Sequence, residues 1–302
     1  MAVAAEVTEA LGAWSCPVAS ITTLGGGWNS STWLVTTRDD QRFVAKLVDH
    51  LDADALTGGL QVAEFAAERG LTCGAPLRTA DGRLTVGLRS GVLTLLRHVP
   101  GTPPDLRAAD HVRRAGQVLG RAHQILGDYP PGDEPRYHWP WEWISTCLET
   151  VPMAPDLKGA AWRAWDQIVA MVDRHQLRVS LIHGDPGPDS FLLSGRDSGP
   201  DALIDWATTL RGPLLYDLAS FAVLSREAGP RPIRWLAEGY AEVGPQISTE
   251  LRHLDSLLRL RWIAQAIWFA SRIERGIDRG PGATTANEDG LAAAYQGIIG
   301  RE

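Results

Sequence analysis

The 302-residue sequence predicts an α+β protein with two lobes. The small lobe, residues 1–99, is expected to hold an antiparallel sheet and one helix, and the larger lobe, residues 100–302, to be mainly helical. Three observations carry this prediction. Strand-like segments crowd the first hundred residues, the Pro-rich stretch PGTPPD at residues 100–105 marks a boundary, and long segments with helical apolar spacing follow it.

The small lobe is predicted to begin with a helix over residues 1–14. Strands are expected from β-branched runs and apolar alternation at residues 18–24, 31–37, 42–49, 82–88 and 91–99. A helix over residues 55–69 follows the third strand, because apolar residues recur there on one side.

The larger lobe is predicted to be helical apart from one hairpin. Helices are expected at residues 107–126, 158–177, 247–275 and 291–299. The exception is the segment 179–208, in which two apolar pieces flank a turn rich in Gly, Asp and Ser.

Composition excludes several classes of protein. Hydrophobic residues make up 44% of the chain and charged residues 22%, as in ordinary globular proteins, and the net charge of −7 argues against nucleic acid as a partner. Cys16, Cys73 and Cys147 lie far apart, which indicates neither a disulfide framework nor a zinc site and fits the reducing cytoplasm. No signal peptide is recognised, and no apolar run approaches the ~18 residues of a membrane span.

A glycine-rich turn between the first two strands is a candidate phosphate site. Gly25, Gly26 and Gly27 would let backbone N–H groups approach phosphate oxygens, with Asn29 and Ser30 beside them. A simple hairpin turn is the alternative interpretation.

Lys46 is the second candidate, because it lies in the middle of an apolar strand. Only two of the 29 basic residues are lysines, so a lysine in this arginine-rich chain is informative. Lys46 is either an edge residue facing solvent or a clamp for nucleotide phosphates, oriented by a carboxylate on the following helix. Glu64 is the first choice for that carboxylate, and Glu68, one turn further along, is the alternative.

The strongest cluster is His183-Gly184-Asp185, followed by Asp205 at the end of an apolar strand. A carboxylate at a strand end suits a hard cation such as Mg²⁺, and Asp185 could accept the proton of an attacking hydroxyl. Aspartates that cap turns are the alternative for each residue taken alone.

In order and spacing, these motifs resemble the aminoglycoside phosphotransferase family, which has a protein-kinase-like fold and includes choline and homoserine kinases. The resemblance covers most of the chain, including Leu95–Gly101, Leu119–His123 and Leu215–Ala219. It implies ATP (or GTP) bound between the lobes, Mg²⁺, and transfer of the γ-phosphoryl group to a hydroxyl. It further implies the following roles: Asp185 as the catalytic residue, Asp205 as the metal ligand, His183 as a support of the loop, and Leu96 and His98 at the nucleotide.

One position departs from the family pattern. Ser190 stands where the family carries a metal-binding Asn, five residues after the catalytic Asp, and a hydroxyl is the shorter and poorer ligand. Two functions therefore stay open: a small-molecule O-kinase, or a peptide-directed kinase or degenerate pseudokinase that binds a peptide or protein in a biosynthetic complex. Retention of Lys46, Glu64, Asp185 and Asp205 favours an active kinase.

The acceptor is expected to be a hydroxylated small molecule, such as an antibiotic or a related metabolite, bound against the helical lobe. Trp141, Trp262 and Trp268 are candidate contacts, because tryptophan stacks on sugars, heterocycles and cationic amines. Packing in the lobe core is the alternative for all three. Asp217 is a further candidate contact, although a role as helix cap and loop anchor explains it better.

Overall fold

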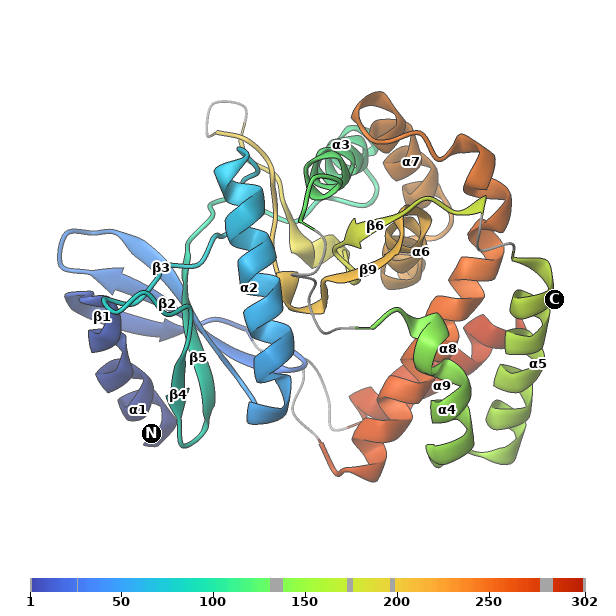
Figure 1. The fold of residues 1–302 in the computed structure, drawn as a ribbon, viewed down its shortest axis with the longest axis horizontal. Helices are drawn as coiled ribbons and strands as arrows, with labels where there is room; N and C mark the ends of the chain where they lie inside the picture. The colour runs from blue at the N-terminus through green and yellow to red at the C-terminus, as the bar shows by residue number, and fades with distance from the viewer. Residues whose placement is uncertain are drawn as a thin grey trace.

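The computed structural model describes residues 2–25, 27–130, 138–172, 176–195, 199–277 and 285–300. Its N-terminal part forms a five-stranded sheet with two helices, and the rest forms a helical body that holds two short two-stranded sheets (Figure 1). The predicted α+β class, with a small antiparallel sheet and a larger helical part, is confirmed.

The sheet is antiparallel and has the strand order β1-β2-β3-β5-β4. Its strands are β1 (Val18–Thr23), β2 (Ser30–Thr37), β3 (Arg42–Val48), β4 (Val86–Leu88) and β5 (Gly91–Arg97). Helix α1 (Ala2–Ala10) and the 3-10 turn Leu11–Trp14 pack on one face, and α2 (Ala53–Glu68) packs on the other (Figure 1).

Strand β3 is central in the sheet, and its alternation decides where Lys46 points. Ala45 and Leu47 are buried in the cluster under α1, whereas Val48 is buried in the cluster under α2. Because successive side chains point to opposite faces of a strand, Lys46 shares the α2 face with Val48. The sheet therefore presents Lys46 toward the helical body.

Helix α2 also touches the helical body directly. A Cβ atom added to Gly59 would lie 2.2 Å from the carbonyl oxygen of Trp206, so only glycine permits this approach. Trp206 begins a 3-10 turn (Trp206–Thr208) immediately after Asp205. Packing of α2 thus holds the segment that carries Asp205.

The helical body is built from seven described helices around one apolar core. They are α3 (Ala109–Leu126), α4 (Pro140–Thr150), α5 (Pro155–Met171), α6 (Leu214–Leu224), α7 (Arg231–Val243), α8 (Leu254–Glu274) and α9 (Ala286–Ile299). Strand β6 (Val179–Ile182) pairs with β9 (Leu210–Pro213), and β7 (Phe191–Leu192) pairs with β8 (Ala202–Leu203). Shorter 3-10 turns lie at His50–Asp52, Pro188–Ser190, Arg226–Ala228 and Ser248–His253.

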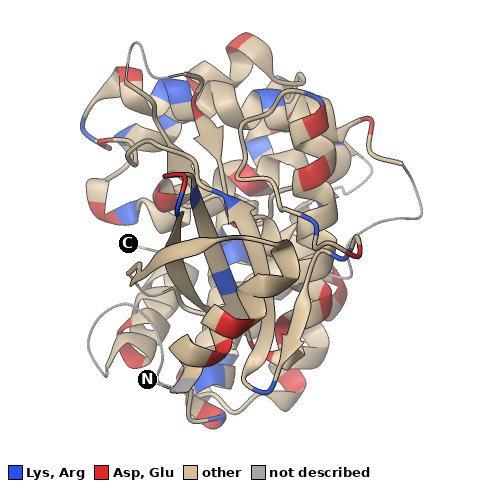
Figure 2. Cartoon of the chain, turned by 90° about the vertical axis from the view of Figure 1, so that its left-hand side faces the viewer, with Lys and Arg blue, Asp and Glu red and all other residues tan. Residues whose placement is uncertain are grey.

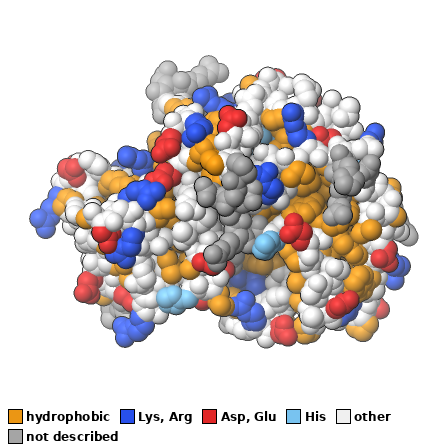
Figure 3. All heavy atoms as spheres, in the orientation of Figure 1, with side chains coloured by type: hydrophobic (Ala, Val, Ile, Leu, Met, Phe, Trp, Pro, Cys, Tyr) orange, Lys and Arg blue, Asp and Glu red, His pale blue; other side chains and the backbone are white. Residues whose placement is uncertain are grey.

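Charged and apolar side chains are distributed differently over the surface. Lys and Arg are interspersed with Asp and Glu in Figure 2, without a continuous basic stripe on the face shown. On the face drawn in Figure 3, hydrophobic side chains are most extensive over the helical body. Within the described residues, none of the helices combines the length and the apolar character needed to cross a membrane.

Candidate active site

Asp205 lies at the junction of the sheet and the helical body. It follows β8 and adopts a left-handed backbone conformation, with φ 70° and ψ 59°. Such a conformation is costly for most residues and is tolerated by Asp, and it is often found at functional sites. The amide of Ile204 donates to the backbone carbonyl of Ser190 at 2.8 Å, so Ser190 lies beside the strand that delivers Asp205.

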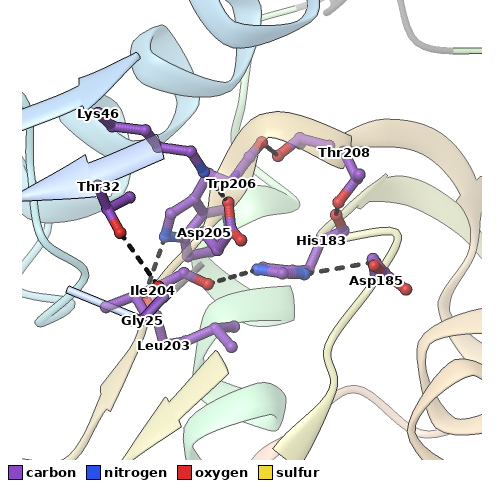
Figure 4. A network of polar contacts seen from close by, with 11 residues as sticks. Gly25, Thr32, Lys46, His183, Asp185, Leu203, Ile204, Asp205, Trp206 and Thr208 are labelled. Carbon is purple, nitrogen blue, oxygen red and sulfur yellow. Dashed lines mark hydrogen bonds and ion pairs between the residues drawn. The ribbon is translucent and has the colours of Figure 1, made fainter. Parts of the chain in front are cut away.

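The ammonium of Lys46 forms an ion pair with Asp205 across the junction (Figure 4). The Lys46 side chain is 11% exposed and that of Asp205 is 58% exposed, so the pair lies at the mouth of the junction. Attraction to the ammonium holds the pKa of Asp205 below its ordinary value, although desolvation opposes this. The carboxylate therefore stays charged.

The pairing of Lys46 with Glu64, predicted from the sequence, is wrong. Glu64 accepts two hydrogen bonds from the guanidinium of Arg78, at 2.7 Å from Nε and 2.5 Å from Nη2. A planar guanidinium matches both oxygens of a carboxylate, which a single ammonium cannot do. Glu64 on α2 is therefore paired with Arg78. The carboxylate that pairs with Lys46 is that of Asp205, from the helical body.

The loop after β6 holds His183, Gly184 and Asp185. His183 donates from Nε2 to the carbonyl of Ile204 at 2.9 Å, and its Nδ1 accepts from the amide of Asp185 at 3.4 Å (Figure 4). A carbonyl can only accept, so the hydrogen of this imidazole belongs on Nε2. His183 thereby joins the segment of Asp185 to the segment of Asp205.

Gly184 is required by the loop geometry. Its φ of +86° favours glycine, and an added Cβ would lie 2.2 Å from the carbonyl oxygen of Thr208. The Thr208 hydroxyl donates back to the carbonyl of His183 at 3.1 Å. The turn Trp206–Thr208 therefore packs directly against the loop of Asp185.

Asp217 anchors this loop from beneath, at the first turn of α6. Its carboxylate accepts from the amides of His183 and Gly184 at 2.9 and 2.8 Å and contacts Nε2 of His123 at 2.9 Å. Its side chain is completely buried. The predicted contact of Asp217 with an acceptor is therefore wrong, because no ligand can reach it, and the loop-anchor interpretation describes its contacts. Behind it, His123 contacts the hydroxyl of Tyr240 at 2.9 Å, and burial raises the pKa of that hydroxyl.

Asp185 is paired with a residue that sequence reasoning missed. Arg261 of α8 forms an ion pair with Oδ1 of Asp185 and also donates from Nε to the Ser220 hydroxyl at 2.9 Å. Ser220 Oγ lies 3.4 Å from the same carboxylate oxygen. Helical spacing could have suggested Arg261, because it precedes Gln265, Trp268 and Arg272 along one face of a helix.

The glycine-rich turn joins β1 to β2 and is tied to α8. Gly25 is contacted by the Thr32 hydroxyl, which donates to its carbonyl at 3.5 Å (Figure 4). Arg272 donates to the Trp28 carbonyl at 3.2 Å and to Oδ1 of Asn29 at 3.3 Å. Gly27 and Ser30 lie in the same turn, and the predicted contact at Gly26 lies outside the described residues.

The three candidate tryptophans lie in different surroundings. Trp141 packs edge-on against Trp165, 5.1 Å between ring centroids. Trp262 faces α9, where a Cβ on Gly297 would lie 2.3 Å from its ring. Only Trp268 reaches the glycine-rich turn, with its ring centroid 5.4 Å from that of Trp28.

Two residues predicted to contact the nucleotide, Leu96 and His98, lie at the end of β5 and just after it. Leu96 of β5 pairs with Val44 of β3 and packs under α2. The amide of His98 donates to the carbonyl of Arg42 at 3.4 Å. Burial and the nearby Arg42 lower the pKa of His98, so its imidazole is neutral at physiological pH.

The donors at the junction fit a metal ion that is shared with a ligand. In the described parts of the chain, no group of three or more His, Cys, Asp or Glu side chains could hold a metal ion. Mg²⁺ does not need such a cage, because it is commonly held by one or two carboxylates, water and substrate phosphates. Asp205 fits that requirement, because its side chain is exposed at the junction. Ser190 lies nearby, since its backbone carbonyl accepts from the amide of Ile204, the residue before Asp205.

Comparison with known proteins places these features in a family. The model of a family described as "Phosphotransferase enzyme family" matches residues 20–254. The homoserine kinase of Methylobacillus flagellatus is 26% identical over 196 residues, a match that covers 65% of this chain and 60% of that enzyme.

Two solved structures share the fold at low sequence identity. A structure described as amicoumacin kinase in complex with AMP-PNP, Ca²⁺ and Ami has a TM-score of 0.76 at 15% identity, covering 97% of this chain and 91% of that one. A microcompartment-associated aminopropanol kinase has a TM-score of 0.75 at 18% identity, covering 99% of this chain and 95% of that one.

Proposed function

This chain belongs to the phosphotransferase enzyme family, as its motifs predict, and from that premise we propose that it phosphorylates the hydroxyl of a small hydroxy amino acid such as homoserine. The phosphoryl donor is ATP or GTP. Residues 1–99 form the nucleotide-binding lobe and residues 100–302 the catalytic and acceptor-binding lobe. We place the protein in the cytoplasm, where ATP is available and where the widely spaced cysteines would stay reduced.

One observation carries the proposal: Lys46, Asp205 and Asp185 come together at the junction, joined through His183 (Figure 4). Phosphoryl transfer needs charge neutralisation and positioning more than covalent chemistry. Lys46 binds the phosphates, and the glycine-rich turn with Gly25, Gly27, Asn29 and Ser30 lies over them. Asp185 orients the acceptor hydroxyl and takes its proton.

Mg²⁺, when bound, neutralises charge on the β- and γ-phosphates. Asp205 would hold the ion, and Ser190 would contribute through its hydroxyl or a bound water. The ion pair with Lys46 keeps Asp205 ionised and therefore ready to bind a cation. The same ion pair joins the metal ligand to the phosphate-binding lysine.

Homoserine is chosen because a homoserine kinase is similar to the chain in sequence, whereas the antibiotic kinase shares only the fold. An antibiotic remains the second candidate acceptor. The peptide-directed kinase or pseudokinase suggested by Ser190 is the competing function from another class.

The test is turnover of the purified protein with ATP or GTP and Mg²⁺ and a panel of acceptors, namely homoserine, 3-aminopropan-1-ol, choline and aminoglycosides. ADP or GDP release and the mass of the product are measured together. Phosphorylated homoserine as the preferred product is expected. Nucleotide binding, seen as a raised melting temperature, without turnover of any acceptor would contradict the small-molecule kinase and favour the pseudokinase.

A further inference from the structure

The carboxylate of Asp185 has two polar neighbours in the helical body. Arg261 and Ser220 both contact Oδ1 of Asp185, from α8 and α6 respectively. The Arg261 side chain is 13% exposed and that of Asp185 is 42% exposed. The carboxylate is thus held through one oxygen, while much of the side chain stays exposed.

This arrangement changes the charge that an acceptor meets. A solitary Asp185 would repel any anionic group carried by the acceptor and would attract an ammonium group. The guanidinium of Arg261 cancels that charge at short range and presents planar N–H geometry that suits a carboxylate.

A second cation, Arg226, packs against α8 beyond the end of α6. Arg226, just after α6, lies 5.5 Å from the ring of Trp262, the residue next to Arg261. The end of α6 reaches the loop itself, because a Cβ on Gly187 would lie 3.2 Å from Leu224. Asp189 is an exposed acid of the same loop.

We propose that the acceptor site selects compounds that carry a carboxylate near the reacting hydroxyl, and that Arg261 is the residue that recognises this carboxylate. This inference rests on the proposed kinase function and narrows its substrate class. The acceptor oxygen forms a bond to the γ-phosphorus as the bond from the γ-phosphorus to the β,γ-bridging oxygen breaks, the hydroxyl proton goes to Asp185, and the nucleoside diphosphate leaves. The acceptor carboxylate stays beside Arg261 throughout and does not react.

Three acceptors isolate the carboxylate. L-Homoserine carries both an ammonium and a carboxylate group, 3-aminopropan-1-ol lacks the carboxylate, and 4-hydroxybutanoate lacks the ammonium. The wild-type kcat/KM for homoserine is expected to exceed that for 3-aminopropan-1-ol by at least about 30-fold, as for loss of a partner from a hydrogen-bonded charge pair. 4-Hydroxybutanoate is expected to lie between them.

Two variants separate recognition from simple support of Asp185. Arg261→Gln removes the charge and should lower the homoserine to aminopropanol ratio of kcat/KM by roughly tenfold or more, mainly through KM for homoserine. Arg261→Lys should restore part of that ratio. Ser220→Ala loosens Asp185 without removing a charge, so it should lower kcat for both acceptors and leave the ratio unchanged.

The outcomes are distinguishable. Melting temperature and its rise with nucleotide show that each variant is folded. An Arg261→Gln variant that slows both acceptors equally overturns the inference and leaves Arg261 as a support of Asp185 alone. Wild-type preference for 3-aminopropan-1-ol also overturns it while leaving the kinase function intact. Turnover of none of the three acceptors overturns the proposed function, and this inference with it.

Discussion

At the scale of single residues, the junction pairs each of its two key carboxylates with one cation. Asp205 of the helical body meets Lys46 of the sheet, and Asp185 meets Arg261 of α8. His183 lies between them and bonds to both segments. The two acids are therefore held near each other with their repulsion compensated, which is what a site for phosphates and a cation needs.

Replacement of Asp185 by Asn tests its role as the proton acceptor. Asn keeps the shape of the side chain but cannot take the hydroxyl proton, so kcat should fall by roughly 10²–10⁴-fold. Nucleotide binding does not depend on this proton transfer, so the rise in melting temperature with ATP and Mg²⁺ should persist. Steady-state kinetics and thermal melts measure the two effects. Loss of nucleotide binding would show that Asp185 belongs to the nucleotide site instead.

Sequence reasoning succeeded at this scale where one short segment contains the chemistry, and it failed where partners are far apart. The loop at His183 and Asp185 is local, so its residues stand out as a motif. Arg261 lies 76 positions from Asp185; its helical spacing places it on one helix face with Trp268 and Arg272, but does not show which residue it contacts. The pairing of Glu64 was wrong because Arg78, in the loop before β4, offers two hydrogen bonds at once.

At the scale of elements, burial explains which helices could be predicted. Helix α3 has a polar face and an apolar face, and the predicted range 107–126 nearly matches Ala109–Leu126. Helix α6 is buried almost all round, so it shows no amphipathic period, and only its Leu215–Ala219 motif is recognisable in the sequence. Helix α7, which was not predicted, lies close to α3 because Gly116 and Gly239 carry no Cβ. Such close packing is a tertiary property.

Replacement of Gly59 by Ala tests whether α2 positions Asp205. The new Cβ would meet the carbonyl of Trp206, so α2 or the Trp206–Thr208 turn must shift. We expect a loss of about 1–3 kcal/mol in the free energy of unfolding, typical of overpacking, together with weaker binding of nucleotide and Mg²⁺. Denaturant unfolding and nucleotide titration measure both.

Gly159→Ala is the matched control for this substitution. Gly159 also lies in a helix, α5, but its added Cβ would meet only the flexible end of Arg163 at 3.4 Å. Stability should stay constant or rise slightly, because Ala favours helix. Equal losses in both variants would contradict a specific role for the contact between α2 and Trp206.

At the scale of the whole molecule, several contacts between described residues join the sheet to the helical body, and three of them meet the candidate site. Lys46 pairs with Asp205, Gly59 packs on Trp206, and the glycine-rich turn is bound by α8. The third connection depends on one arginine of α8. Arg272 is 4% exposed, donates to Trp28 and Asn29 in the turn and to Asn287 in α9, and lies 4.8 Å from the ring of Trp268.

This third connection leads to the last prediction, which concerns Arg272. A lysine has one compact donor group and cannot reproduce the separate contacts of a guanidinium to the turn and to α9. Arg272→Lys and Arg272→Ala should therefore both lower the free energy of unfolding by about 1–3 kcal/mol, because buried acceptors lose their donor. Both should also weaken nucleotide binding roughly tenfold. A turn released by the substitution must be ordered again when the nucleotide binds, and a loss of about 1.4 kcal/mol in binding free energy corresponds to that factor.

Hydrogen exchange across residues 24–30 provides the direct measurement, because exchange there should accelerate in both variants while strand β5 stays protected. The neighbouring Arg275→Ala is the control, since Arg275 is exposed just beyond the end of α8. Unchanged exchange in the turn, with nucleotide affinity intact, would contradict a role for Arg272 in ordering the nucleotide site. Faster exchange confined to α9 would mean that Arg272 acts on that helix and that the turn is ordered by its own hydrogen bonds.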